Sequence, residues 1–286
     1  MNTIKNRMKM YWSLIKSLQT GLLVITGITG YFSAQCPVTT INTFLLLTLS
    51  LFLTVSGSTV LNMVWDRDID SKMKRTQHRP LASNKMKASE AWIFGSLISV
   101  MGIGIAYTLS PLFAYVVFAG LFIDVVIYTI WLKRRTAWSI VWGGLSGGMP
   151  ILAGRVLGTS SIDIIGILLT IAILMWIPTH ILTFSIKYKK DYAKAGIPTF
   201  PSTYGVDMTR KIIALSSIFA AISIGTGAIA LGLSWGYLRL LGVLSVGIIG
   251  LAILSIFRPS EKVNFGLFKY ASVYMLGSMM MLSFGL

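Results

Sequence analysis

The sequence contains a single cysteine, Cys36, among 286 residues. One thiol excludes an intramolecular disulfide framework and a metal site built from several cysteines. Charge is scarce as well: charged residues make up 12% of the chain, whereas soluble domains average about 25%. A soluble fold of this length needs more charge to cover its surface. With 55% hydrophobic residues and a mean hydropathy of +0.76, the composition instead indicates an all-α, polytopic membrane protein.

The hydrophobic segments are long enough for nine membrane-spanning helices, since a span needs roughly 20 mostly apolar residues. Turn-forming pairs separate several of them, such as Cys36-Pro37 after the first and Ser110-Pro111 after the third. We expect residues 1–286 to form one intramembrane domain, with the helices around a central cavity. The predicted spans are 12–33, 40–63, 89–109, 112–132, 138–157, 162–186, 211–232, 235–257 and 265–286.

Acidic residues are few: the chain has nine Asp and Glu but 25 Lys and Arg, which gives a net charge of +16. In a soluble protein this excess would suggest nucleic acid, but here we expect no nucleic-acid partner and assign it to anionic membrane lipid. Nine spans place 23 of the cations on one side and only Arg155 and Arg239 on the other. The positive-inside rule then predicts a cell-membrane protein whose N-terminus and cation-rich face are cytoplasmic.

Three polar side chains follow the second predicted span at a spacing of four residues: Asn62, Asp66 and Asp70. If the helix continues to its end, all three lie on one face. Two carboxylates and an amide oxygen are ligands that suit Mg²⁺. The alternative is a solvated loop that serves only topology, but topology depends on Lys and Arg and gains little from Asp.

Cations follow these carboxylates directly, and Arg75 and Arg79 are suited to grip phosphate bidentately. A second polar segment follows the sixth predicted span, where Lys187, Asp191 and Lys194 share a helical face. We expect it to lie on the same membrane side and to bind phosphate, so that a diphosphate sits between the two segments. For its lysines, the alternative is an ordinary positive-inside loop.

These strings resemble a known family. Asn62-xxx-Asp66-xxx-Asp70, followed by Lys74-Arg75-Thr76 and Arg79-Pro80-Leu81, is similar to the first motif of the UbiA superfamily of intramembrane prenyltransferases. The resemblance is narrower to the protoheme IX farnesyltransferases (heme O synthases). Further stretches that carry it are Tyr128 to Thr136, the glycines Gly143, Gly144, Gly147 and Gly148 with Pro150, Trp176-Ile-Pro178-Thr-His180, and Lys190-Asp191-Tyr192 with Ala195 to Pro198.

Two departures from the family pattern are visible. The first span usually carries a Lys-Pro pair, and here it reads Lys16-Ser17. Many superfamily members have a second Asp-xxx-Asp motif, whereas the matching positions here are Tyr188 and Tyr192. Heme-type members commonly lack that motif, so the second departure supports the narrower resemblance and leaves the first motif as the metal site.

The resemblance implies an enzyme that transfers a farnesyl group from farnesyl diphosphate to a vinyl group of heme b, with addition of water, to give heme o. Its cofactor would be Mg²⁺, with heme b as a substrate, and a downstream heme-modifying enzyme or oxidase assembly protein as a partner. The implied metal-binding and catalytic set is Asn62, Asp66 and Asp70, with Asp191 as a further catalytic residue. The diphosphate set is Lys16, Arg75, Arg79, Lys133, Arg134, Lys187 and Lys190, and the acceptor set is His180, Trp176 and Tyr188.

Asp124 lies in the middle of the fourth predicted span. A carboxylate there costs roughly 2.5–3.5 kcal/mol on insertion scales and is usually functional or paired. Tyr128, one turn on, is a candidate donor to it.

Two alternatives to the implied function remain: a prenyltransferase for a quinone precursor or another lipid acceptor, and a secondary transporter. The His180 region argues against the first, and the gathering of polar residues at one face rather than the midplane argues against the second.

Overall fold

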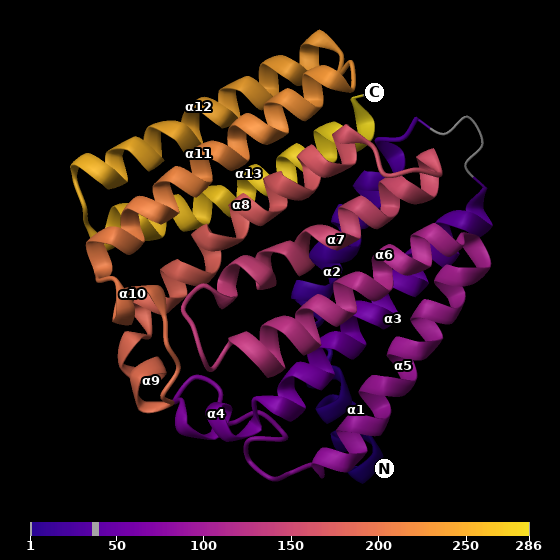
Figure 1. The fold of residues 1–286 in the computed structure, drawn as a ribbon, viewed down its shortest axis with the longest axis vertical. Helices are drawn as coiled ribbons and strands as arrows, with labels where there is room; N and C mark the ends of the chain where they lie inside the picture. Colours follow the sequence, from indigo (N-terminus) through magenta and orange to yellow (C-terminus); the bar gives the residue numbers. More distant parts are fainter. Residues whose placement is uncertain (1, 36–39, 286) are drawn as a thin grey trace.

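The computed structural model describes residues 2–35 and 40–285, and these residues form helices and turns without strands, as predicted (Figure 1). The predicted break at Cys36-Pro37 lies outside the described residues. The helices are α1 (Asn2–Leu14), α2 (Ser17–Phe32), α3 (Ile41–Trp65), α4 (Arg67–Lys72), α5 (Ala88–Leu109), α6 (Pro111–Phe122), the π-helix η1 (Ile123–Leu132), α7 (Ser139–Thr159), α8 (Ile164–Lys187), α9 (Lys189–Lys194), α10 (Phe200–Thr203), α11 (Val206–Ala230), α12 (Trp235–Phe257) and α13 (Glu261–Phe284).

Eight helices among the described residues are long and apolar enough to cross a membrane, and they coincide with the second to ninth predicted spans. One of them is α6 continued by η1. Helix α2 has 16 residues, about 24 Å at 1.5 Å per residue, which is less than the roughly 30 Å of a bilayer core. The first predicted span, 12–33, therefore stays a prediction. The chain is a multi-pass membrane protein, and its two ends lie at opposite ends of the bundle (Figure 1).

The first predicted span is not one continuous helix. Helix α1 ends at Leu14 and α2 begins at Ser17, with Lys16 between them in the left-handed region at φ 46°. This backbone conformation is strained for a residue other than glycine. The break separates an amphipathic arm from the apolar helix and, as shown below, brings Lys16 to the central cavity.

Small residues allow the helices to pack closely, as is usual in membranes. A Cβ atom at Gly154 of α7 would overlap the backbone carbonyl of Gly27 of α2, and one at Gly57 of α3 would overlap the backbone of α5. Helix α13 joins this group through Ser283, whose hydroxyl lies 3.0 Å from that of Thr29. Helices from both halves of the chain thereby surround a common interior.

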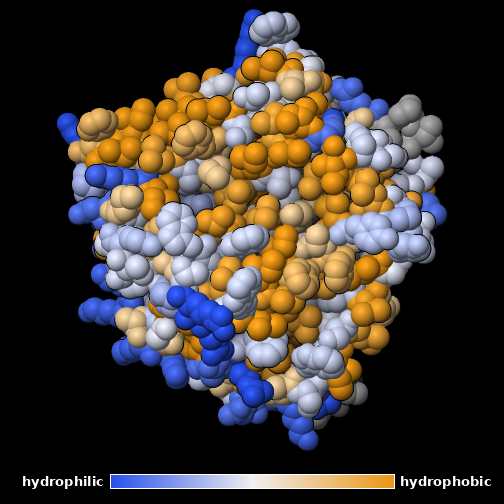
Figure 2. Space-filling view, in the orientation of Figure 1, coloured by the Kyte–Doolittle hydropathy of each residue, from blue (hydrophilic) through white to orange (hydrophobic). Residues whose placement is uncertain are grey.

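Figure 2 shows broad apolar areas over the upper and right parts of this face. Large apolar side chains are exposed on the molecule, among them Leu18, Val246 and Phe257. Hydrophilic side chains gather along the lower and left margins of this view, where α4, α9 and α10 lie in Figure 1. The N-terminus is at this same end of the bundle (Figure 1). The polar connections thus meet at one end of an otherwise lipid-compatible body.

Candidate active site

The end of α3 carries the three predicted metal ligands. The helix ends at Trp65, and Asp66 lies between α3 and α4. The N–H of Asp66 still donates to the carbonyl of Asn62 at 2.9 Å, and that of Asp70 donates to the carbonyl of Asp66 at 2.8 Å. The predicted uninterrupted helix is therefore broken at Asp66, but the three residues remain one turn apart.

Both carboxylates are buried, at 6% exposure for Asp66 and 5% for Asp70, and each meets a cation from a distant position. Lys133, which follows η1, pairs with Asp66 through its ammonium group. Arg79 donates from Nη1 to Oδ2 of Asp70 at 2.7 Å. Two members of the predicted diphosphate set therefore stand directly beside the predicted metal ligands.

The second carboxylate oxygen of Asp66, Oδ1, indicates that a cation binds here. Oδ1 is buried and has no hydrogen-bond partner among the described residues, which is costly for a carboxylate. Within that part of the chain no three His, Cys, Asp or Glu side chains gather into a metal site. A metal here would rest on Asp66, Asp70 and the Asn62 amide, with water and phosphate oxygens completing its shell. That donor set fits Mg²⁺.

The Asn62 amide is held from both sides. Its Nδ2 donates to Oδ2 of Asp124 at 2.7 Å, and its Oδ1 accepts from the hydroxyl of Thr129 at 2.8 Å. Asp124 also accepts from the Ser58 hydroxyl. The donors to Asp124 are therefore Ser58 and Asn62, and not Tyr128 as predicted. Asp124 is thus a paired intramembrane carboxylate that orients a predicted metal ligand.

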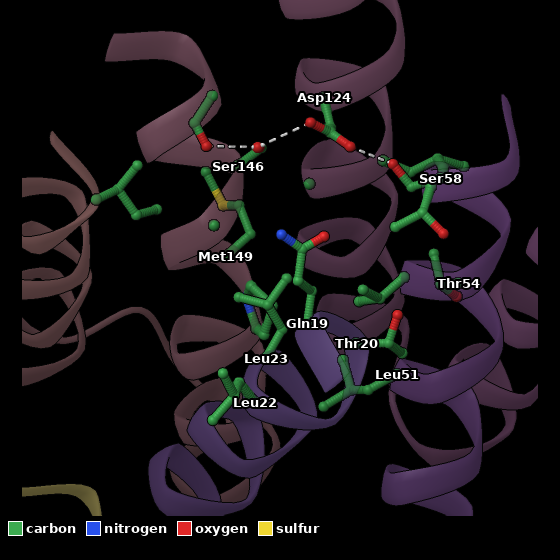
Figure 3. A pocket seen from close by; sticks show the side chains of 18 of the residues that line it. Gln19, Thr20, Leu22, Leu23, Leu51, Thr54, Ser58, Asp124, Ser146 and Met149 are labelled. Carbon is green, nitrogen blue, oxygen red and sulfur yellow. Dashed lines mark hydrogen bonds between the residues drawn. The ribbon is translucent and has the colours of Figure 1, made fainter. Parts of the chain in front are cut away.

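A cavity of about 350 Å³ opens next to these residues, lined by α2, α3, α6, η1, α7 and α8. Lys16 and Asn62 lie on its wall together with Asp124, and Trp176 and His180 contribute from α8. Figure 3 shows Gln19 and Thr20 of α2 pointing toward Ser58 and Asp124 across this space. The predicted central cavity therefore exists, and it joins Asn62 of the first motif to Trp176 and His180 of the predicted acceptor set, whereas Asp66, Asp70 and Tyr188 do not line it.

His180 lies in a ring of aromatic side chains. Its imidazole centroid is 4.1 Å from that of Trp176 and 4.5 Å from that of Phe268. Nε2 lies 3.0 Å from the hydroxyl of Ser272, whereas Nδ1 is buried without a hydrogen-bond partner. Packing and one hydrogen bond fix the ring and leave one nitrogen for a further ligand.

The second polar segment reaches the first, as the sequence predicted. Apolar side chains of the α4 region, Ile69 and Met73, pack in one cluster with Ala195 and Ile197 after α9. The Arg75 guanidinium lies 5.6 Å from the centroid of the Tyr188 ring. Further along, the Lys187 ammonium lies 5.6 Å from the Tyr188 ring and 5.3 Å from the Phe265 ring. Lys190 is exposed and Asp191 half-buried on α9.

Comparison with known proteins identifies this arrangement. The sequence model of the UbiA prenyltransferase family matches residues 23–273, which include both polar segments and the cavity wall from Leu23 onward. The chain belongs to the UbiA prenyltransferase family. Among its relatives is the protoheme IX farnesyltransferase of Korarchaeum cryptofilum, 39% identical over 73% of this chain and 70% of the relative. That of Pyrobaculum islandicum is 34% identical over 93% of this chain and 95% of the relative.

Solved structures agree on the UbiA fold. A digeranylgeranylglyceryl phosphate synthase superposes with a TM-score of 0.80 at 20% identity, covering 98% of each chain. A UbiA homologue from Archaeoglobus fulgidus bound to GPP and Mg²⁺ superposes with a TM-score of 0.67 at 15% identity, over 96% of this chain and 99% of that one. At these identities the comparison establishes the fold.

One predicted diphosphate ligand of this UbiA prenyltransferase is engaged elsewhere. Arg134 donates two hydrogen bonds to the carboxylate of Asp68, at 2.7 and 2.8 Å, and a third to the carbonyl of Trp65. These hydrogen bonds lower the pKa of Asp68 below its ordinary value. Arg134 therefore braces the end of α3 on its exposed side, while its neighbour Lys133 reaches the inner carboxylate.

Sequence reasoning missed the residues that hold the predicted site in place. Ser58 and Thr129 fix the Asp124–Asn62 pair, and Ser272 and Phe268 fix His180. Ser58 lies one turn before Asn62, so its spacing offered a signal. Ser272 and Phe268 come from α13, about 90 residues after His180, and nothing in the local sequence pairs them.

Proposed function

We propose that this protein transfers a farnesyl group from farnesyl diphosphate to a vinyl group of heme b, with addition of water, to give heme o. The observation that carries the proposal is the single cavity that runs from Asn62 and Lys16 to Trp176 and His180. The charged diphosphate fits the polar wall near Lys16 and Asn62, and the farnesyl chain fits the apolar wall. The protoheme IX farnesyltransferases among its relatives support the same substrates.

The diphosphate would bind where the two polar segments meet. Asn62, Asp66 and Asp70 would hold Mg²⁺, which when bound neutralises charge on the leaving diphosphate. Arg75 and Arg79 of the first segment and Lys190 of the second supply positive charge around the phosphates, with Lys16 on the cavity wall and Lys133 beside Asp66. Asp191 completes the set from α9. These cations stabilise the diphosphate as its bond to carbon breaks.

The farnesyl chain would lie among the apolar residues of the cavity. Leu22, Leu23 and Leu51 line it, and the Tyr128 ring offers an aromatic face. Ionisation leaves positive charge on the first carbon of the farnesyl group, and an aromatic face stabilises such a cation by about 0.5–2 kcal/mol. The apolar wall keeps bulk water from this carbon until the acceptor reacts.

His180 would position heme b, with Nδ1 as the atom available to the heme iron and Trp176 and Tyr188 beside the acceptor. In the reaction, the bond between farnesyl carbon and diphosphate oxygen breaks, and that carbon bonds to the outer vinyl carbon. The inner vinyl carbon takes the hydroxyl of water, whose remaining proton is released. Heme b, farnesyl diphosphate and water thereby give heme o and diphosphate.

We propose further that residues 1–286 act as one catalytic domain in the cell membrane, with the polar end facing the cytoplasm. The asymmetric distribution of cations supports this orientation. A heme product that stays in the membrane would pass to a heme-modifying enzyme or an oxidase assembly protein.

The test uses purified protein in detergent with heme b, farnesyl diphosphate and Mg²⁺, and mass spectrometry for heme o. Asp66→Ala should lose at least 100-fold in rate, because it removes a metal ligand. Asp68→Ala is the matched control, since Asp68 lies two residues away and contacts Arg134 on the exposed side. Absence of heme o from folded protein, with product formed from a quinone precursor instead, would refute the heme acceptor. Lack of any prenylated product would refute the enzymatic proposal.

A further inference from the structure

A second pocket lies at the polar end of the molecule, between α1 and the connection from α4 to α5. It is an open pocket of about 370 Å³. Its wall consists of Lys9, Met10 and Ser13 from α1 and of Arg75, His78, Arg79, Pro80 and Lys85 from the connection. None of these residues lines the central cavity, so the two hollows are separate.

The charge of this pocket is one-sided. Its wall carries two lysines and two arginines, Lys9, Lys85, Arg75 and Arg79, and among the described residues no carboxylate lines it. Arg79 has a partner behind the wall in Asp70, which still leaves three cations facing one opening. Converging like charges repel one another, and an anion bound between them removes that cost. Guanidinium and ammonium groups together match the oxygens of a phosphate group.

Helix α1 places the pocket at the membrane surface. Leu14 is buried against α3 and α5 residues, and the Tyr11 hydroxyl donates to Glu90 of α5 at 2.5 Å. Outside this anchor, Met8 and Trp12 are exposed apolar side chains on the helix that carries Lys9. Cationic and apolar side chains exposed together are typical of a helix that lies in the headgroup region.

We propose that this pocket binds a phosphate group at the membrane surface, outside the central cavity. The phosphate has two sources: the headgroup of an anionic phospholipid, or free diphosphate on its way to or from the catalytic end. Lys9, Lys85 and His78 contact its oxygens, and Arg75 and Arg79, which belong to the proposed catalytic diphosphate set, form the wall on the side of that site. The proposal goes beyond the proposed function and does not depend on it, because its test measures binding rather than catalysis.

The test compares wild-type protein with the double variant Lys9→Gln, Lys85→Gln. The matched control is Lys5→Gln, Lys87→Gln, which removes the same charge from the same two segments at exposed positions that do not line the pocket. The lipid arm measures retention of phosphatidylglycerol against phosphatidylcholine of equal chain length by native mass spectrometry. The free-phosphate arm titrates inorganic diphosphate by calorimetry in EDTA, so that no metal contributes. Thermal unfolding in detergent verifies that all variants are folded.

We expect phosphatidylglycerol retention to fall about tenfold in the double variant, and in the control to stay within twofold of wild type. The same loss in the diphosphate titration, without preference for phosphatidylglycerol, would assign the pocket to free diphosphate. Equal binding of both phosphate forms by wild-type, double-variant and control proteins would overturn the proposal. A loss of the same size in the control would overturn it as well, since only net charge would then matter.

Discussion

At the residue scale, the half-buried carboxylate Asp124 decides how a predicted metal ligand is oriented. Its Oδ2 accepts from both Ser58 and Asn62, so its charge fixes which end of the Asn62 amide faces Thr129. Groups that orient a metal ligand typically change metal affinity 10- to 100-fold when they are replaced. The sequence indicated only that this carboxylate needed a partner.

We therefore expect Asp124→Asn to weaken Mg²⁺ binding about tenfold, because the substituted amide no longer attracts Asn62 Nδ2 as strongly. Titration with Mn²⁺ followed by electron paramagnetic resonance measures this directly, and the Mg²⁺ dependence of the rate supplies a second readout. Ser146→Ala is the control, since that hydroxyl lies 3.4 Å from Asp124 Oδ1 and contributes little. Unchanged Mn²⁺ affinity in folded Asp124→Asn protein would contradict the orienting role.

His180 is the second residue whose surroundings define a test. Its ring is fixed by Trp176, Phe268 and Ser272, with Nδ1 unpartnered. We expect His180→Ala to weaken heme b binding at least tenfold and to change the heme absorption spectrum, because the iron loses a nitrogen ligand. Ser272→Ala should retain the wild-type spectrum with weaker binding, since it releases the ring without removing it. A wild-type heme spectrum in His180→Ala would show that the iron is held elsewhere.

At the element scale, the sequence predicted where helices lie better than where they break. Hydropathy placed the second to ninth spans within a few residues of their observed bounds, such as 89–109 against Ala88–Leu109. It could not predict the left-handed residue Lys16 or the π-helical turn pattern of η1, because both depend on packing around the cavity rather than on composition. The spacing of Asn62, Asp66 and Asp70 left open whether the helix continues past the predicted span 40–63, and α3 in fact ends at Trp65.

The same limit applies to Arg155. It was counted simply as one of two cations on the less basic side, yet it is buried at 6% exposure. Its Nη2 pairs with Asp163 at 2.5 Å, and it also donates to the Ser33 carbonyl at the end of α2. Asp163 in turn caps α8 by accepting from the N–H of Gly166 at 2.8 Å. One ion pair thus ties the ends of α2, α7 and α8 together.

Asp163→Asn should lower the thermal unfolding midpoint clearly, since leaving a buried cation uncompensated costs about 3 kcal/mol. Hydrogen bonds from Arg155 lower the pKa of Asp163 in the folded protein below its unfolded value. The stabilisation is therefore fully present at neutral pH and is lost as the pH falls through the folded pKa. Unfolding midpoints of the two proteins should differ equally at pH 7 and pH 6 and converge in strong acid. A difference that vanished already at pH 6 would contradict this assignment.

At the scale of the whole molecule, the polar connections and the hydrophilic surface mark one end of the bundle, and we propose that this end is catalytic. The polar connections that carry α4, α9 and α10 gather at the end where the N-terminus lies (Figure 1), and hydrophilic side chains concentrate there (Figure 2). The cavity links Asn62 at this end to His180 within α8. In the proposed function, the diphosphate binds near the first and the heme acceptor beside the second.

This arrangement predicts the orientation of the protein in the membrane. With Cys36→Ser as background, Lys87→Cys should react with a membrane-impermeant maleimide only from the cytoplasmic side, and Ser161→Cys only from the opposite side. Both positions are exposed, and they lie at opposite ends of membrane-spanning helices, before α5 and after α7. The measurement compares labelling of intact cells with that of inside-out vesicles.

Labelling of both cysteines from the same side would mean that an odd number of the helices α5, α6–η1 and α7 does not cross. That result would contradict a membrane crossing by each of these long apolar helices. If the two cysteines were labelled from opposite sides and Lys87→Cys reacted in intact cells, the protein would have the inverted orientation in the membrane. The diphosphate end would then face away from the cytoplasm, where prenyl diphosphates are made, and the proposed reaction would lose its access to substrate. The orientation experiment therefore tests the function as well as the topology, because the positive-inside rule and the position of the carboxylates must give the same answer.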